Sequence, residues 1–257
     1  MPTTPESRLK DRATTTPEND SPPAYVPLGS QAATMSEQQL APPTPPVTVK
    51  PTNFLFVKRD SGRTGIMGTY VIDPRIKVPQ SMLPPLAEGQ SEATRQNVFL
   101  HADDGCTGIN VDLFVLGDAN TKRSLNMFLE STNGYITARL HAASTARPPI
   151  HITAEATHSI SLHLPRTFRG PVTVRNYSKR SSIRISEHLK AGMMPLSEAN
   201  HTWRYFVGTP EGWTDESKWA GDEVTVCLNY RGSGDVTLQY DVEPRAADPS
   251  KGRCLVC

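Results

Sequence analysis

The chain of 257 residues carries 27 Lys and Arg residues against 26 Asp and Glu residues, which leaves a formal net charge of +1. So balanced a charge gives no reason to expect nucleic acid as a partner. The length allows one large β domain or two small ones with a sizeable core. No apolar run of about 18 residues occurs, so we expect no membrane-spanning helix. The first residues lack an apolar signal core, which favours a cytoplasmic location.

Residues 1–51 differ in composition from the rest of the chain. They hold 11 of the 23 prolines, many Ser and Thr residues and almost no aromatic residue. Proline removes backbone donors, and such a segment offers too little apolar area to offset the entropy lost on ordering. We therefore predict a disordered Pro/Ser/Thr-rich arm over residues 1–51, a single all-β domain over 52–243 and a flexible tail over 244–257.

Strand signals follow, first at residues 53–58 and 66–72, where β-branched and aromatic residues are enriched. Four units come next, each with two runs of alternating apolar residues around a short polar turn. These units cover residues 98–115, 126–140, 150–164 and 172–185. Two last strands, 223–230 and 235–242, are expected to form a hairpin. The pattern predicts an all-β fold, a short solenoid-like stack of strand–turn–strand units closed by that C-terminal hairpin, with a two-sheet β-sandwich as the alternative.

The unit at residues 126–140 is the clearest of the four, because Asn133-Gly134 is a strong signal for a hairpin turn. Alternation gives a period of two, but it does not say which phase points inward. Phe128 and Ile136 are the alternative core pair. We do not expect one face to hold all of Met127, Leu129, Ile136 and Leu140.

Five short segments carry a resemblance to a known family: 66–74 (IMGTYVIDP), 95–100 (RQNVFL), 133–136 (NGYI), 206–208 (FVG) and 219–224 (WAGDEV). Together they resemble a domain-of-unknown-function family found mainly in mushroom-forming fungi, over about residues 53–243. The strand–turn–strand units also resemble the adhesin-like β-repeats of bacteria and fungi. The resemblance implies an all-β fold with a Pro-rich arm outside it. It implies no activity and no catalytic residues.

No catalytic motif is present: the chain lacks a nucleophile elbow, a phosphate-binding loop, a dinucleotide fingerprint and a zinc-helix motif. We therefore expect no enzyme and no cofactor. The seven histidines are scattered, and those on strands are expected to face solvent, so no metal site is predicted. The Asp-Asp-Gly sequence at residues 103–105 lacks further oxygen ligands at the spacing of a calcium loop, and we interpret it as a turn.

Aromatic and acidic residues gather before the last two predicted strands and form the candidate binding surface. Exposed Trp rings stack on sugars, and paired carboxylates cleave glycosides. These residues would make the chain a carbohydrate-binding or carbohydrate-active protein, whereas the simpler reading is that both Trp rings cap the end of the core. The group consists of Trp213, Asp215, Glu216, Trp219, Asp222 and Glu223.

The last four residues, Cys254-Leu-Val-Cys257, fit the C-a-a-X pattern for prenylation of Cys254. Few basic residues precede them, and one lipid chain alone gives reversible membrane binding. The alternatives are a redox or metal-binding pair of cysteines, or no role. We therefore expect a non-enzymatic interaction module, tethered as a lipoprotein to cytosolic membrane faces and acting on an unknown protein partner. A soluble cytosolic scaffold is the third reading, after the carbohydrate protein.

Overall fold

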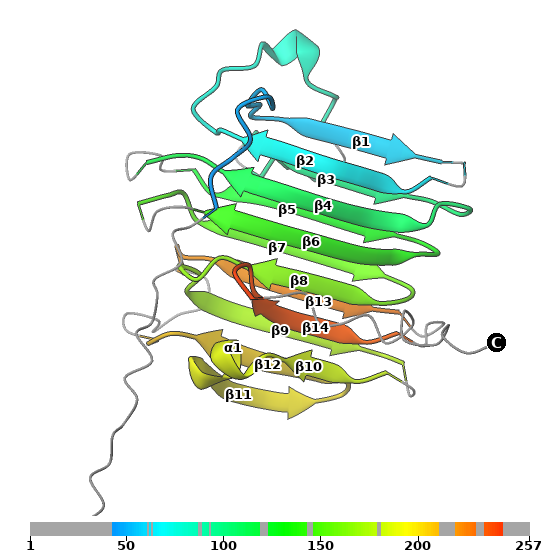
Figure 1. Cartoon of the computed structure of the whole chain (residues 1–257), viewed down its shortest axis with the longest axis vertical. Coiled ribbons are helices and arrows are strands. Elements are labelled where there is room, and N and C mark those ends of the chain that lie inside the picture. Colours follow the sequence, from blue (N-terminus) through cyan, green and yellow to red (C-terminus); the bar gives the residue numbers. More distant parts are fainter. Residues whose placement is uncertain are drawn as a thin grey trace, which may run out of the picture. The chain divides into compact units, whose positions relative to one another are not determined.

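The computed structural model places most of the described residues in two β-sheets (Figure 1). It describes residues 43–60, 62, 64–86, 89–92, 94–118, 123–142, 146–178, 181–210, 219–229 and 234–243. The larger sheet has eight strands and is mixed, and the smaller sheet has six parallel strands. The β-rich fold expected from the sequence is therefore confirmed. The predicted tail and residues 1–42 of the predicted arm lie outside the described residues.

The larger sheet is parallel except at one end, where β12 pairs antiparallel with both of its neighbours. Its strands, in spatial order, are β1 (Leu55–Arg59), β3 (Val98–Ala102), β5 (Leu125–Ser131), β7 (Ile150–Ala156), β13 (Glu223–Leu228), β9 (Gly170–Asn176), β12 (Thr202–Val207) and β11 (Met193–Ala199). Those of the smaller sheet are β10 (Ile183–Ile185), β14 (Val236–Tyr240), β8 (Ile160–Leu164), β6 (Tyr135–Ala142), β4 (Gly108–Val115) and β2 (Ile66–Ile72). Two short helices complete the fold, η1 (Gln80–Met82) and α1 (Glu187–Ala191).

Consecutive strands of each predicted unit lie in opposite sheets, so the units are not hairpins. In the unit at residues 126–140, β5 pairs with β3 and β7, while β6 pairs with β4 and β8. A two-residue hairpin turn of type I′ needs positive φ at both central residues, and neither Asn133 nor Gly134 has it. Gly134 serves close packing instead: a Cβ there would lie 2.9 Å from Cα of Gly108, the first residue of β4.

The predicted C-terminal hairpin is wrong for the same reason. β13 lies between β7 and β9 in the larger sheet, and β14 lies between β8 and β10 in the smaller one. The last two strands therefore sit inside both sheets and close neither of them. The larger sheet is also mixed, with antiparallel pairs at one end. The described residues thus show two sheets, and they do not show the predicted solenoid closed by a hairpin.

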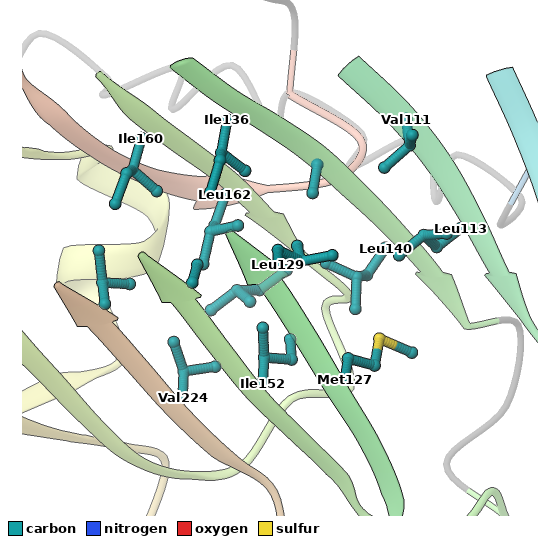
Figure 2. Close-up of a cluster of buried hydrophobic side chains, with 14 of the residues drawn as sticks. Val111, Leu113, Met127, Leu129, Ile136, Leu140, Ile152, Ile160, Leu162 and Val224 are labelled. Atoms are coloured by element: carbon teal, nitrogen blue, oxygen red, sulfur yellow. The ribbon is translucent and has the colours of Figure 1, made fainter. Parts of the chain in front are cut away.

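The core lies between the two sheets and is built from the alternate residues of each strand that point inward (Figure 2). In β7, Ile152 and Ala154 are buried, whereas His151 and Thr153 lie on the outer face. In the unit at residues 126–140 the inward residues are fully or almost fully buried in one cluster. Of the alternative core pair, Ile136 is buried, whereas Phe128 points outward and stacks on Phe99. These inward residues are Met127, Leu129, Ile136 and Leu140.

The two sheets end differently beyond β9 and β10. The larger sheet continues with β12 and β11, whereas the smaller sheet stops at β10. Helix α1 follows β10 and is capped by Ser186, whose Oγ accepts a hydrogen bond from the backbone N–H of Leu189 (3.2 Å). The Leu189 side chain is buried in the core. The core side of β11 and β12 is thus covered by one short helix and by no strand of the smaller sheet.

Candidate functional site

The uncovered end of the core forms a groove of about 870 Å³. Figure 1 shows the elements that form it, α1, β10, β11 and β12, together at the lower end of the two stacked sheets. It is lined by Asn176, Ser181, Ile183, Arg184, Ile185, Lys190, Met193, Pro195, Trp203 and Tyr205. We call these ten residues the end groove.

The aromatic floor of the end groove comes from β12. Trp203 and Tyr205 lie on the core side of this strand, opposite Val174 and Val172 of β9, and pack against the core. Both side chains remain only partly buried, because no strand of the smaller sheet covers them. Burial, together with the negative charge of Glu198, raises the pKa of Tyr205. Its phenol is therefore neutral and able to donate a hydrogen bond into the groove.

One wall of the end groove is strand β10, which pairs only with β14 among the described strands. Its other edge is therefore open to a further strand, as the edges of sheets are. The two charged residues of the lining, Arg184 and Lys190, are both cationic. Arg184 contacts Asp235 at 2.8 Å, and Lys190 lies 3.9 Å from Glu187. All these groups are at least partly exposed, so water screens the pairs and leaves the rim weakly basic.

The described part of the chain ends at Glu243, beside this groove. The Glu243 Oε1 atom accepts a hydrogen bond from the hydroxyl of Ser186 (2.9 Å), the residue between β10 and α1. It also accepts one from the backbone N–H of Tyr240 (3.0 Å). The last described residue is thus held by Ser186, the neighbour of the lining residue Ile185, and Cys254 lies outside the described residues.

Half of the predicted carbohydrate surface also lies outside the described residues, namely Trp213, Asp215 and Glu216. The structure places Asp222 in the interior, where its carboxylate accepts two hydrogen bonds from the Arg147 guanidinium, at 2.6 and 2.7 Å. It accepts two more from the backbone N–H groups of Ile150 and Arg169, each at 2.9 Å. Four donors occupy this carboxylate, so it is engaged in holding three loops together.

Trp219 is half-buried, and its ring meets the edge of the Phe206 ring at a centroid distance of 5.3 Å. Its Nε1–H donates to the backbone oxygen of Asp222 at 2.8 Å. This placement matches a Trp that caps the end of the β structure. Glu223, the first residue of β13, is exposed. Carbohydrate binding by this region stays a prediction.

The end groove was not predicted from the sequence, because its lining comes from segments that no short motif joins. The signal that could have found it is the alternation Trp203, Tyr205, Val207, which gives β12 one apolar face at the end of the domain. Strand β11 was missed because most of its residues are exposed and it contains Pro195. Because β11 was not predicted, the wall of the groove that it forms was not predicted either.

The model of one family, a domain of unknown function (DUF7330), matches residues 53–243. This range includes every strand and both helices described above. Searches of curated proteins and of solved structures find no match. Among the described residues, no helix has the length and apolar character needed to cross a membrane.

Proposed function

We propose that this chain, which belongs to the DUF7330 family of domains of unknown function, is a non-enzymatic interaction module that holds an extended segment of a partner protein in its end groove. The observation that carries the proposal is the pairing of an open strand edge, β10, with an apolar floor that contains Trp203 and Tyr205. Sheet-edge recognition uses these two parts: backbone hydrogen bonds supply affinity, and pockets for alternate side chains supply specificity.

The groove also indicates the chemistry of the bound segment. Its floor suits apolar side chains at alternate positions, since alternate residues of a strand face the same side. Arg184 and Lys190 favour a segment with acidic residues at its flanks. The β10 strand is only three residues long, so few backbone bonds are available and the side chains must supply most of the affinity.

The second part of the proposal is a membrane tether. Prenylation of Cys254 would place a lipid eleven residues after Glu243, a distance of at most roughly 36–40 Å for an extended chain. The tail leaves the described domain beside the groove. A tethered molecule would therefore hold its groove close to the cytosolic face of a membrane. One lipid chain gives reversible attachment.

A display library of random peptides tests the groove. We expect selection on the immobilised full chain to enrich peptides with alternating apolar residues and acidic flanks. Met193→Glu, which places a charge in the groove, should abolish their binding. Met194→Glu is the matched control, because Met194 is the next residue of β11, is 44% exposed and does not line the groove. Peptides that bind both variants equally, or no enrichment, would refute the proposal.

The tether is tested separately by flotation with liposomes after expression in a host that prenylates proteins. The wild-type chain should partly float with the vesicles, and Cys254→Ser should stay in the soluble fraction. An intact-mass measurement reports the lipid directly. Equal soluble distribution of both proteins without added mass would remove the tether and leave a soluble scaffold.

A further inference from the structure

Three side chains that can bind a metal ion meet at the end of strands β1 and β3. Asp60 follows β1, His101 belongs to β3, and Asp103 follows β3. Parallel pairing of the two strands sets Arg59 opposite Ala102, and the backbone N–H of Asp103 then donates to the carbonyl oxygen of Arg59 (2.9 Å). As a result, one ligand atom from each of the three side chains lies within 4.8 Å of the other two.

The imidazole of His101 is oriented by a carboxylate on the next strand. Its Nδ1 atom lies 2.9 Å from Oε2 of Glu130, which stands opposite His101 on β5. An ionised carboxylate can only accept, so Nδ1 carries the hydrogen of this bond. The ring also stacks on Phe99 at 6.2 Å, and its side chain is 13% exposed. Its other ring nitrogen, Nε2, lies 3.9 Å from Oδ2 of Asp103.

Asp103 is held in the same way. Its Oδ1 atom accepts hydrogen bonds from the backbone N–H of Asp104 (2.8 Å) and from the hydroxyl of Thr132 (3.0 Å). Its second oxygen, Oδ2, lies 3.9 Å from Nε2 of His101. Neighbouring groups of the chain thus orient both His101 and Asp103.

We propose that Asp60, His101 and Asp103 form a binding site for one divalent transition-metal ion, represented by Zn²⁺, with Glu130 as the positioning residue of His101. An imidazole nitrogen together with carboxylate oxygens suits such ions better than it suits Ca²⁺ or Mg²⁺. A carboxylate that accepts from the other ring nitrogen of the ligating histidine is the usual outer partner of zinc-bound imidazole. Three protein ligands leave the remaining coordination position for water.

One neighbouring group opposes the ion. The Lys58 ammonium lies 2.9 Å from Oδ1 of Asp60, and the Lys58 side chain is 48% exposed. A bound cation must displace this ammonium into water. Lys58 therefore weakens metal binding, and Lys58→Met should strengthen it by roughly tenfold, because Asp60 then has no competing cation.

Zinc titration by calorimetry tests the site. All proteins compared are full-length and carry Cys254→Ser and Cys257→Ser, so that tail thiolates bind no metal. We expect one equivalent of Zn²⁺ to bind, and His101→Gln to weaken binding at least tenfold. Glu130→Gln should weaken it by about 10- to 100-fold, since it removes the charge that orients the ring. His151→Gln is the control, because His151 lies on the same face of the same sheet but belongs to β7, away from the cluster.

Two results would overturn the proposal: no binding of Zn²⁺ at one equivalent, or equal affinity of the parent protein and His101→Gln. Metal-free circular dichroism and melting curves show whether each variant is folded. Lys58→Met adds a readout that a folding defect cannot imitate, because it predicts a gain in affinity. An unchanged or lower affinity of folded Lys58→Met would count against Asp60 as a ligand and so against the proposed site.

Discussion

Replacing Asp222 with alanine should unfold the molecule at a markedly lower temperature. Asp222 and Arg147 are both almost fully buried, with 6% of each side chain exposed, and they share two short hydrogen bonds. Asp222→Ala leaves the guanidinium buried without its counter-charge. It also removes the acceptor of two backbone N–H groups, those of Ile150 and Arg169.

The magnitude follows from the buried pair. Removing one partner of a buried ion pair costs about 3–5 kcal/mol of unfolding free energy. For a domain of this size, 1 kcal/mol shifts the melting temperature by about 2–4 °C, so we expect a decrease of about 6–20 °C. Arg147→Met alone should cost less, because a hydrophobic side chain can fill the space. The double variant should be more stable than the sum of the two single losses implies, since no unpaired charge remains buried.

Urea denaturation of the wild type, both single variants and the double variant measures the loss of unfolding free energy that each change causes. Glu223→Ala is the matched control: it changes the adjacent, exposed acidic residue and should alter the stability by less than about 0.5 kcal/mol. A loss below about 1 kcal/mol for Asp222→Ala would refute the reasoning, as would two single losses that simply add.

Three further predictions concern packing and charge. In denaturant curves, Gly108→Ala should lower the free energy of unfolding by at least about 2 kcal/mol more than Gly62→Ala does. The two glycines have nearly equal φ, +122° and +120°, but a Cβ at Gly108 would collide with the Tyr135 carbonyl, whereas a Cβ at Gly62 would have no atom within 4 Å. Equal losses would mean that backbone strain alone decides. Burial and repulsion from Glu130 raise the pKa of Glu155. The charged carboxylate therefore destabilises the fold at neutral pH, and this cost disappears as the pH falls through the raised pKa and the group is protonated. Glu155→Gln should therefore stabilise the fold by a few tenths of a kcal/mol at neutral pH and by nothing below about pH 4, as melting curves at both pH values will show. Hydrogen bonds from Arg75 lower the pKa of Asp73, so this carboxylate stabilises the fold above its unfolded pKa and the contribution is lost as the pH falls through its depressed pKa. Asp73→Asn should cost about 0.5–1 kcal/mol at neutral pH and nothing in strong acid, and a cost that does not change with pH would contradict the role of the charge.

The sequence was sufficient to predict most strands and insufficient to predict how they pair. Alternation in β7, with Ile152 and Ala154 inward, is a local property and was visible directly. Pairing is not local. The Asn133-Gly134 signal belongs to hairpins, yet here the glycine is needed for its close approach to Gly108. The phase of β5 was equally hidden, because Phe128 is as apolar as Met127 and only its neighbour Phe99 explains why it lies outside.

The candidate sites were less predictable than the strands, for a similar reason. The end groove unites residues from β10, α1, β11 and β12, and its existence depends on two strands that extend one sheet further than the other. The proposed metal ligands Asp60 and His101 are separated in the sequence by β2, η1 and a long loop, and only the register of β1 on β3 brings them together. His101 was expected to be merely solvated. The expected surface histidines at positions 141 and 163 are in fact buried.

The position of β13 and β14 inside the two sheets has a consequence for the order in which the molecule can be made. Strands β9 to β12 leave the ribosome before β13 and β14, yet β9 and β10 each need one of those last strands as a neighbour. One edge of β7 has no native partner until β13 is made, and one edge of β8 has none until β14 is made at residue 240. Open parallel edges invite pairing with other chains, so the nascent protein must keep a strand-wide gap free in both sheets until its last two strands emerge.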